Sequence, residues 1–365
     1  MQAPLRTSPT DASPDKKSGP SRRRGALRLA ALLGLLLIVF LLDVAIGSVK
    51  IPLKEVCKVL FSIRSGNNTW QYIIEEIRIP KALTAVLAGC GLSVGGLQMQ
   101  TLFRNPLAGP AELGITAGAS LGVAMVMLAG GSITTLYTIK ELGLSGSWLI
   151  IAAACGGAAG IMLLVVSLSG TVRDNVMMLI IGVMISSLTL SVISIWQYFS
   201  APELIKDYLL WTFGSLGGVT GSQLYLLTGV VAVGLIITFL SSKLLDALLL
   251  GDNYARSMGL SVQRARIVII CSTSLLAGSV TAFCGPIAFI GIAVPHMARF
   301  LFNTSTHRIL IPACCLIGVL VMLVCDIIAH LPGSETVLPI NVITALVGAP
   351  VVIWIILRRN NIRGF

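Results

Sequence analysis

Long apolar runs separated by short polar breaks fill most of this chain. The hydrocarbon core of a bilayer requires about 20 apolar residues in a helix. By run length and polar breaks, the sequence predicts ten membrane-spanning helices, at 27–46, 81–101, 112–131, 147–168, 176–198, 223–241, 266–284, 286–302, 309–329 and 339–357. We therefore predict an all-α polytopic membrane protein with one transmembrane domain over 26–365. Residues 1–25, rich in Ser, Pro and charge, are expected to form a disordered tail.

Composition supports the membrane interpretation. Of the 365 residues, 55% are hydrophobic and 11% are charged, which lies outside the range of soluble domains. The first run could instead belong to a signal peptide, but it is long for one. Its removal would leave nine spans and move the arginine-rich C-terminus to the other side of the membrane.

The basic residues give an orientation. Ten crossings place both termini on one side, and with that side cytoplasmic, 18 of the 26 Lys and Arg residues are cytoplasmic. The net charge of +11 is thus mainly an orientation signal, and nucleic acid is not an expected partner. We predict a multi-pass protein of the cell (inner) membrane, in contact with lipid, with both termini cytoplasmic.

The chain offers few groups for catalysis or metal binding. Its eight cysteines show no C-x-x-C pair and its three histidines are scattered, so no metal site or catalytic residue is predicted. Asp43 and Asp326 are the ionisable residues clearly within the apolar runs, both near an outer end. Ion-coupled carriers place charge nearer the midplane, so the driving force is expected to come from another subunit.

Glycine spacing indicates how the helices pack. Glycines recur every four residues in three predicted spans, a spacing that lets helix backbones approach closely. They are Gly91 and Gly95 in the second span, Gly114, Gly118 and Gly122 in the third, and Gly156 and Gly160 in the fourth. The spacing predicts a compact bundle.

The predicted cytoplasmic loop at about 242–265 contains a short polar helix in the stretch "LGDNYARSMGLS". Asp252 suits the positive end of a helix dipole and Gly259 suits a tight stop. Such a helix could dock in a cleft of a partner, or it could be an ordinary surface connection.

Several motifs together resemble the FecCD-type permeases of importers for iron-siderophores, haem and vitamin B12. The acidic-x-x-Ala-x-x-x-Gly spacing of Asp252, Ala255 and Gly259 is similar to the motif that couples such permeases to their ATPases. The stretches "RIPKALTAVLAGCGLSVGGLQMQTLFRNPLAGPAELGITAGAS", "GPIAFIGIAVPHMARFL" and "LPINVITALVGAP" resemble family motifs in the same order. The resemblance implies a type II ABC importer permease: two ten-helix subunits, here a homodimer, with two ATPase subunits and an extracytoplasmic substrate-binding protein.

The resemblance also implies three groups of site residues. The ATPase-coupling group is Leu250, Gly251, Asp252, Ala255, Met258, Gly259 and Leu260. The cytoplasmic gate is Asn105, Leu107, Asn175 and Val176, although Asn105 could equally cap a helix end. The binding-protein docking group is Arg78, Lys81 and His330, where His330 stands in place of the family's usual arginine and interface anchoring is the alternative role.

No stretch resembles a nucleotide-binding loop, so this chain is expected to bind no cofactor and to leave ATP and Mg²⁺ to the partner ATPase. The chain is accordingly a transport permease and not an enzyme. An iron(III)-siderophore is the first cargo that the resemblance implies, with haem and cobalamin as alternatives. A stand-alone channel or membrane scaffold is the contrasting class.

Overall fold

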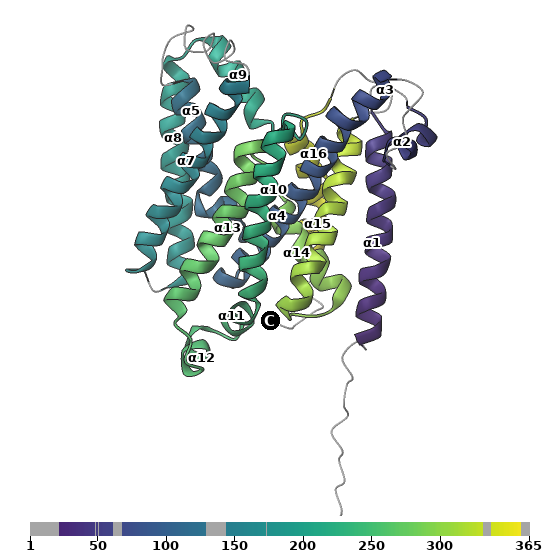
Figure 1. Ribbon diagram of the computed structural model, residues 1–365. Helices are drawn as coiled ribbons and strands as arrows, with labels where there is room; N and C mark the ends of the chain where they lie inside the picture. Colours follow the sequence, from purple (N-terminus) through teal and green to yellow (C-terminus); the bar gives the residue numbers. More distant parts are fainter. Residues whose placement is uncertain are drawn as a thin grey trace, which may run out of the picture.

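The computed structural model describes residues 22–47, 49, 51–60, 68–128, 144–172, 174–330 and 337–358, and all regular structure in these ranges is helical. Figure 1 shows a bundle of long helices with short helices at both ends. The elements in chain order are α1 (Arg22–Ala45), α2 (Leu53–Leu60), α3 (Asn68–Tyr72), the π-helix η1 (Ile73–Arg78), α4 (Ile79–Phe103), the 3₁₀ helix η2 (Pro110–Leu113), α5 (Ile115–Met127), α7 (Leu144–Ser169), α8 (Asn175–Phe199), α9 (Pro202–Thr212), α10 (Gly221–Leu240), α11 (Ser242–Leu249), α12 (Asp252–Ser257), α13 (Val262–Cys284), α14 (Ile290–Phe302), α15 (His307–Ala329) and α16 (Ile340–Arg358).

Each predicted span corresponds to a helix of the described residues: α1, α4, α5, α7, α8, α10, α13, α14, α15 and α16. Within the described ranges, seven helical segments are long and apolar enough to cross a bilayer, and α5, α14 and Ile340–Trp354 of α16 are shorter apolar helices. The first helix begins at Arg22, inside the predicted tail at 1–25, and residues 1–21 lie outside the described ranges.

The predicted span at 286–302 is wrong at its start, because α14 begins only at Ile290. Gly285 and Phe289 have positive φ angles of 76° and 67°, which interrupt a right-handed helix. The intervening backbone is paired with neighbouring elements: the Ala288 N–H donates to Asn341 Oδ1 at 3.1 Å. Non-helical backbone at membrane depth requires such internal partners.

The second span, α4, forms the centre of the bundle. In the most apolar stretch of the helical segment Asn68–Phe103, 78% of the residues are buried, against 11% in α1. The helices α10, α13, α14 and α15 all pack against α4. Figure 1 shows α4 running obliquely among these helices, with α1 at one edge and α5, α7 and α8 at the other.

Glycines form the closest helix contacts, but not all of them are the predicted ones. A Cβ added at Gly118 of α5 would lie 2.6 Å from the Gly157 carbonyl oxygen of α7, and one added at Gly157 would lie 2.0 Å from that of Gly118. Gly156 and Gly160, predicted from their spacing, have nothing within 4 Å of an added Cβ. The fourth span therefore packs through the glycine that the four-residue pattern leaves out, because Gly157 points to α5 and its neighbour points away.

Buried polar side chains fix α4 against α10 and α13. Gln98 of α4 donates to Ser272 Oγ at 3.0 Å and accepts from Thr273 Oγ1 at 2.6 Å. Thr238 of α10 lies 2.9 Å from Ser272 and also bonds to Gln98. Each of these polar side chains thus has a hydrogen-bond partner within the protein, as is usual for buried polar groups.

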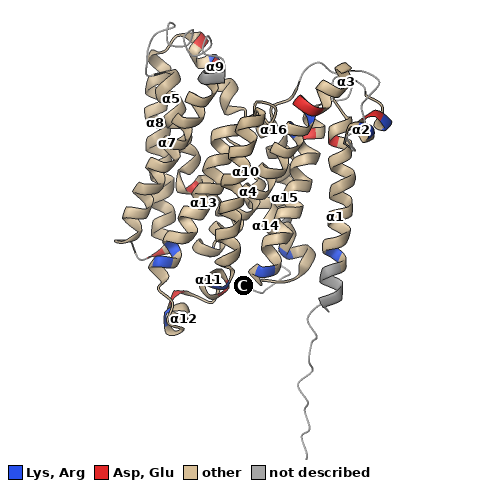
Figure 2. Cartoon of the chain, viewed as in Figure 1, with Lys and Arg blue, Asp and Glu red and all other residues tan. Residues whose placement is uncertain are grey.

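The two ends of the bundle carry most of the charge. Figure 2 shows Lys, Arg, Asp and Glu concentrated toward these ends, with α11 and α12 at one of them. The helix α1 begins and α16 ends at this same end, called the α12 end below (Figure 1). This agrees with an even number of crossings.

The two adjacent glycines of α7 provide a matched test of the packing. Gly157→Ala should lower the stability of the protein by about 1–3 kcal/mol, because the new methyl group overlaps the Gly118 carbonyl. Gly156→Ala should change stability by less than about 0.5 kcal/mol. Thermal unfolding of both variants in the same detergent measures the difference; equal Tm values would contradict this packing.

Candidate functional site

The short helix α12 is held by hydrogen bonds typical of a glycine-terminated helix. The Leu260 N–H donates to the Ala255 carbonyl at 3.1 Å, and the Gly259 N–H donates to the Arg256 carbonyl at 2.9 Å. This pair of bonds is a Schellman motif, which requires a left-handed residue after the helix. Gly259 supplies it with φ +81°, a conformation that costs glycine little.

The carboxylate of Asp252, in the first turn of α12, joins two arginines from two other helices. Its Oδ1 lies 3.0 Å from Arg104 Nη2, and its Oδ2 lies 2.7 Å from Arg266 Nη2. The Arg266 side chain is 4% exposed and that of Arg104 is 43% exposed. The two ion pairs therefore differ, since the pair with Arg266 is desolvated and the pair with Arg104 is open to water.

Both arginines extend this network toward the predicted gate. Arg104 ends α4 in a left-handed conformation and directly precedes Asn105. Arg266 of α13 also donates to the Val172 carbonyl at 3.2 Å, in the connection that leads into α8 at Asn175. Asp252 thus connects the helix predicted to couple to an ATPase with both segments predicted to form the gate.

Side-chain hydrogen bonds shape the turn after α4. Asn105 Oδ1 accepts from the Leu107 N–H at 3.0 Å, and His296 of α14 is bonded to the Pro106 carbonyl through Nε2 at 2.8 Å. The bond to Leu107 is an Asx turn within the non-helical 104–109 segment, so Asn105 does not cap a helix end. Its gate role stays a prediction.

The other predicted gate residues differ in exposure. Leu107 is 45% exposed and Val176 is 61% exposed, whereas Asn175 is buried with its Oδ1 unpaired among the described residues. Asp174 caps α8 by accepting from the Met177 N–H at 2.8 Å. The two apolar side chains are free to meet a partner, and Asn175 in this conformation is not.

Exposed apolar side chains lie on α12 and at both of its ends. Tyr254 of α12 and its flanking residues Leu250 and Met258 are each at least half exposed, while Ala255 is fully buried against the bundle. Together with the exposed polar side chains of Asn253 and Arg256, they form a mixed surface that could enter a partner's cleft.

A second contact holds the preceding helix, α11. His307 of α15 lies between Asp246 of α11 and Thr101 of α4, with Nδ1–Oδ1 2.6 Å and Nε2–Oγ1 2.8 Å. Partial burial opposes ionisation of Asp246, but the hydrogen bonds from His307 hold the pKa of this carboxyl below its usual value. Both helices of the 242–265 loop are therefore tied to α4, directly or through one partner.

The predicted docking residues lie at the opposite end, but two of them are buried. Arg78 donates to the carbonyls of Val44, at 2.9 Å, and Ala45, at 2.7 Å. Lys81 Nζ lies 2.8 Å from Asp326 Oδ2, and both side chains are less than a tenth exposed. Each of these two cations therefore has its partners inside the chain in this structure.

His330 completes this buried charge cluster. Its Nδ1 is 3.0 Å from the Asp326 carbonyl, and Lys81 Nζ is 3.4 Å from its ring nitrogens. Asp43 of α1 is also buried nearby and interacts with Asp326. The cluster thus joins α1, α4 and α15, and a role in docking a binding protein stays a prediction.

Sequence reasoning missed Arg104, Arg266 and the His307–Asp246 pair. Arg104 stands next to the predicted Asn-Pro-Leu-Ala turn and Arg266 near the start of a span, so each was counted only as an orientation signal. Basic residues at the first or last turn of an apolar run, combined with the two acidic residues of the 242–265 loop, form the pattern that could have found them.

The comparison with family models shows the family. The model of the FecCD transport family matches residues 35–358. The chain belongs to the FecCD transport family. FecCD relatives include the hemin transport system permease protein HmuU of Yersinia pestis, 31% identical over 93% of this chain and 99% of its own length. The vitamin B12 import system permease protein BtuC of Klebsiella pneumoniae is 34% identical over 93% of this chain and 96% of its own.

A solved structure extends this FecCD likeness to the fold. It is described as a metal-chelate type ABC transporter in an inward-facing conformation. Its TM-score is 0.78 at 26% identity, and the match covers 91% of this chain and 99% of that one. The fold is therefore that of an ABC importer permease.

Two substitutions should show that the ion pairs of Asp252 contribute differently to stability. Asp252→Asn leaves the buried guanidinium of Arg266 without its counter-charge and should cost about 1–3 kcal/mol of stability. Arg104→Gln removes only the exposed pair and should cost less than about 1 kcal/mol. Thermal unfolding of the two variants checks the order, and an equal or larger loss in Arg104→Gln would contradict it.

Proposed function

We propose that this chain is the membrane-spanning permease of an ATP-driven importer that carries an iron(III)-siderophore across the inner membrane. The arrangement around Asp252 is the observation that carries the proposal. One carboxylate links a short helix with exposed apolar side chains on and beside it to the two segments at the α12 end that lead into α5 and α8. A partner that moves α12 would therefore act on both segments.

The partner at α12 is proposed to be an ABC ATPase subunit. Leu250, Tyr254 and Met258 would enter its cleft, with Gly251 and Gly259 shaping the ends of the helix and Leu260 following it. With the ATPase bound there, the α12 end, with the first residue of α1 and the last of α16, would lie in the cytoplasm. The chain itself would bind no nucleotide, so ATP and Mg²⁺ would belong to the partner.

Two further partners complete the importer. A substrate-binding protein would deliver cargo at the end that carries Arg78, Lys81 and His330. A second copy of the chain would form the other half of the path, and Asn105, Leu107, Asn175 and Val176 would close it at the α12 end. The exposed apolar side chains of Leu107 and Val176 suit closure across a two-fold axis.

Haem or cobalamin is the second candidate cargo. The hemin and vitamin B12 names of the two relatives favour it. In each case the metal belongs to the cargo, and the described residues include no group of three or more His, Cys, Asp or Glu side chains that could hold a metal ion. Recognition would therefore involve the whole chelate and not coordination of its metal by this chain.

An uptake assay with the reconstituted transporter tests both the identity of the cargo and the assignment of the chain as an importer permease. The chain is placed in liposomes with its ATPase and binding protein, and ATP-dependent uptake of a ferric siderophore, haem and cobalamin is measured side by side. Uptake of the siderophore alone is the expected result. Uptake of haem or cobalamin instead would replace the cargo, whereas failure of the ATPase to bind would overturn the function assigned to α12.

Gly259 offers a conformational test of coupling. Gly259→Val places a β-branched residue at φ +81°, with a strain of about 1–2 kcal/mol, and should reduce transport per ATP hydrolysed by about tenfold. Gly259→Asn is the control, because asparagine tolerates this conformation and nothing lies within 4 Å of an added Cβ. Full coupling in the valine variant would count against the coupling role.

A further inference from the structure

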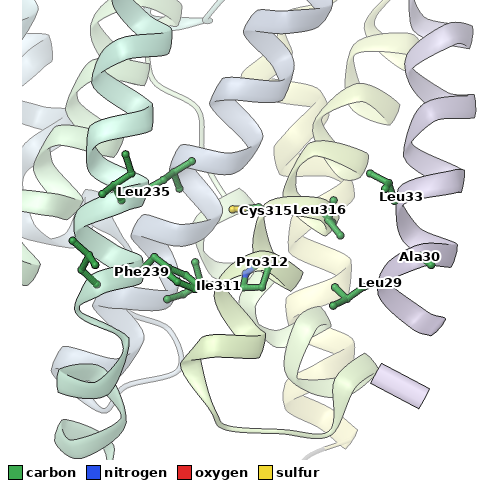
Figure 3. A pocket seen from close by; sticks show the side chains of 11 residues that line it. Leu29, Ala30, Leu33, Leu235, Phe239, Ile311, Pro312, Cys315 and Leu316 are labelled. Atoms are coloured by element: carbon green, nitrogen blue, oxygen red, sulfur yellow. The ribbon is translucent and has the colours of Figure 1, made fainter. Parts of the chain in front are cut away.

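An apolar groove opens on the side of the bundle between α1, α10 and α15. Its volume is about 680 Å³ and its lining is almost wholly apolar. Figure 3 shows side chains of α1 and α10 on either side of those of α15. The lining includes Leu29, Leu33, Phe239, Leu240, Ile311 and Pro312.

Basic residues lie near the α12 end of each lining helix, in α1 and α15 themselves and in α11, which follows α10. Arg28 directly precedes Leu29, Lys243 follows Leu240 by three positions, and Arg308 precedes Ile311 by three positions. All three side chains are exposed. Arg28 is held in place by its bond to the Leu301 carbonyl at 2.7 Å.

The acidic residues of the same helices do not balance this charge. Asp43 and Asp326 lie at the opposite end of α1 and α15, and α10 has no acidic residue. Asp246 of α11, whose Oδ1 accepts the His307 N–H and is bonded to His307 Nδ1, interacts with Arg308 and offsets one of the three positive charges. The three cations at the α12 end of the groove therefore keep a net positive charge beside an apolar surface.

We propose that this groove binds one acyl chain of an anionic phospholipid, whose phosphate interacts with Arg28, Lys243 and Arg308. The proposal rests on the membrane location given by the proposed function. An apolar groove ending in three cations matches an acyl chain that ends in a phosphate. A second copy of the chain fits less well, since an isologous contact would bring the basic mouths toward each other.

The lipid would also connect to the coupling helix. Lys243 lies in the first turn of α11, and α11 leads directly into α12 through Leu250 and Gly251. A phosphate on Lys243 would tie α11 to α1, which otherwise packs mainly on α15. Lipid composition would thereby set how freely α11 moves.

Lipid retention measured by native mass spectrometry tests the proposal. The full chain is purified with phosphatidylglycerol or phosphatidylcholine of identical acyl chains, and retained lipid is counted. Phosphatidylglycerol should be retained preferentially, and the double variant Lys243→Gln/Arg308→Gln should weaken its retention by about fivefold for each cation removed. Arg264→Gln, which removes an exposed cation from the first turn of α13 outside the groove, should leave retention unchanged.

A second variant tests the acyl-chain position without changing charge. Ala30→Trp fills the groove and should lower retention of both lipids, with thermal unfolding as a check on folding. Equal retention of the two lipids by the wild type, an equal loss in Arg264→Gln, or full retention in Ala30→Trp would each overturn the proposal. Displacement by free glycerol phosphate would assign the site to a soluble phosphate instead. The assay needs neither ATPase nor cargo, so its outcome is separate from that of the uptake experiment.

Discussion

The shared carboxylate of Asp252 is the contact on which the α12 end of the molecule depends. It is one acidic group between two cations, of which Arg266 is almost completely buried. A buried guanidinium without a counter-charge is strongly unfavourable, so α12 cannot leave α13 without a replacement partner. The position of α12 is thus coupled to the helix beneath it by this ion pair as well as by the buried side chain of Ala255.

At the opposite end of the bundle, buried cations are stabilised in a different way. Arg78 is satisfied largely by backbone carbonyls at the end of α1, and Lys81 by a carboxylate of α15. Neither arrangement leaves a cation exposed to water. Charge therefore fixes the relative positions of helices at both ends, while the middle of the bundle relies on glycine contacts and a few hydroxyl and amide groups.

Hydrophobic run length was sufficient to predict all ten long or apolar helices, since a membrane span leaves a strong local signal. It failed for the start of α14. The non-helical backbone before this helix is stabilised by hydrogen bonds to α16 and to the 213–215 segment, which are distant in the sequence. The same limit applies to Gly157, whose importance depends on which side of α7 faces α5. The motif residues of the loop were predicted by resemblance, but Asp252's partners were not, because they come from positions 148 and 14 residues away.

The hydroxyl and amide cluster around Gln98 has a consequence for motion. A shift of α4 along α10 or α13 by one residue would break the hydrogen bonds between the Gln98 amide and its hydroxyl partners. Each buried polar group left unpaired would cost about 1–3 kcal/mol. The three helices are therefore held in register. The contact between α5 and α7 at Gly118 and Gly157 is made by close backbone approach and contains no such polar side-chain pair, so these two helices are not held in register by the same means.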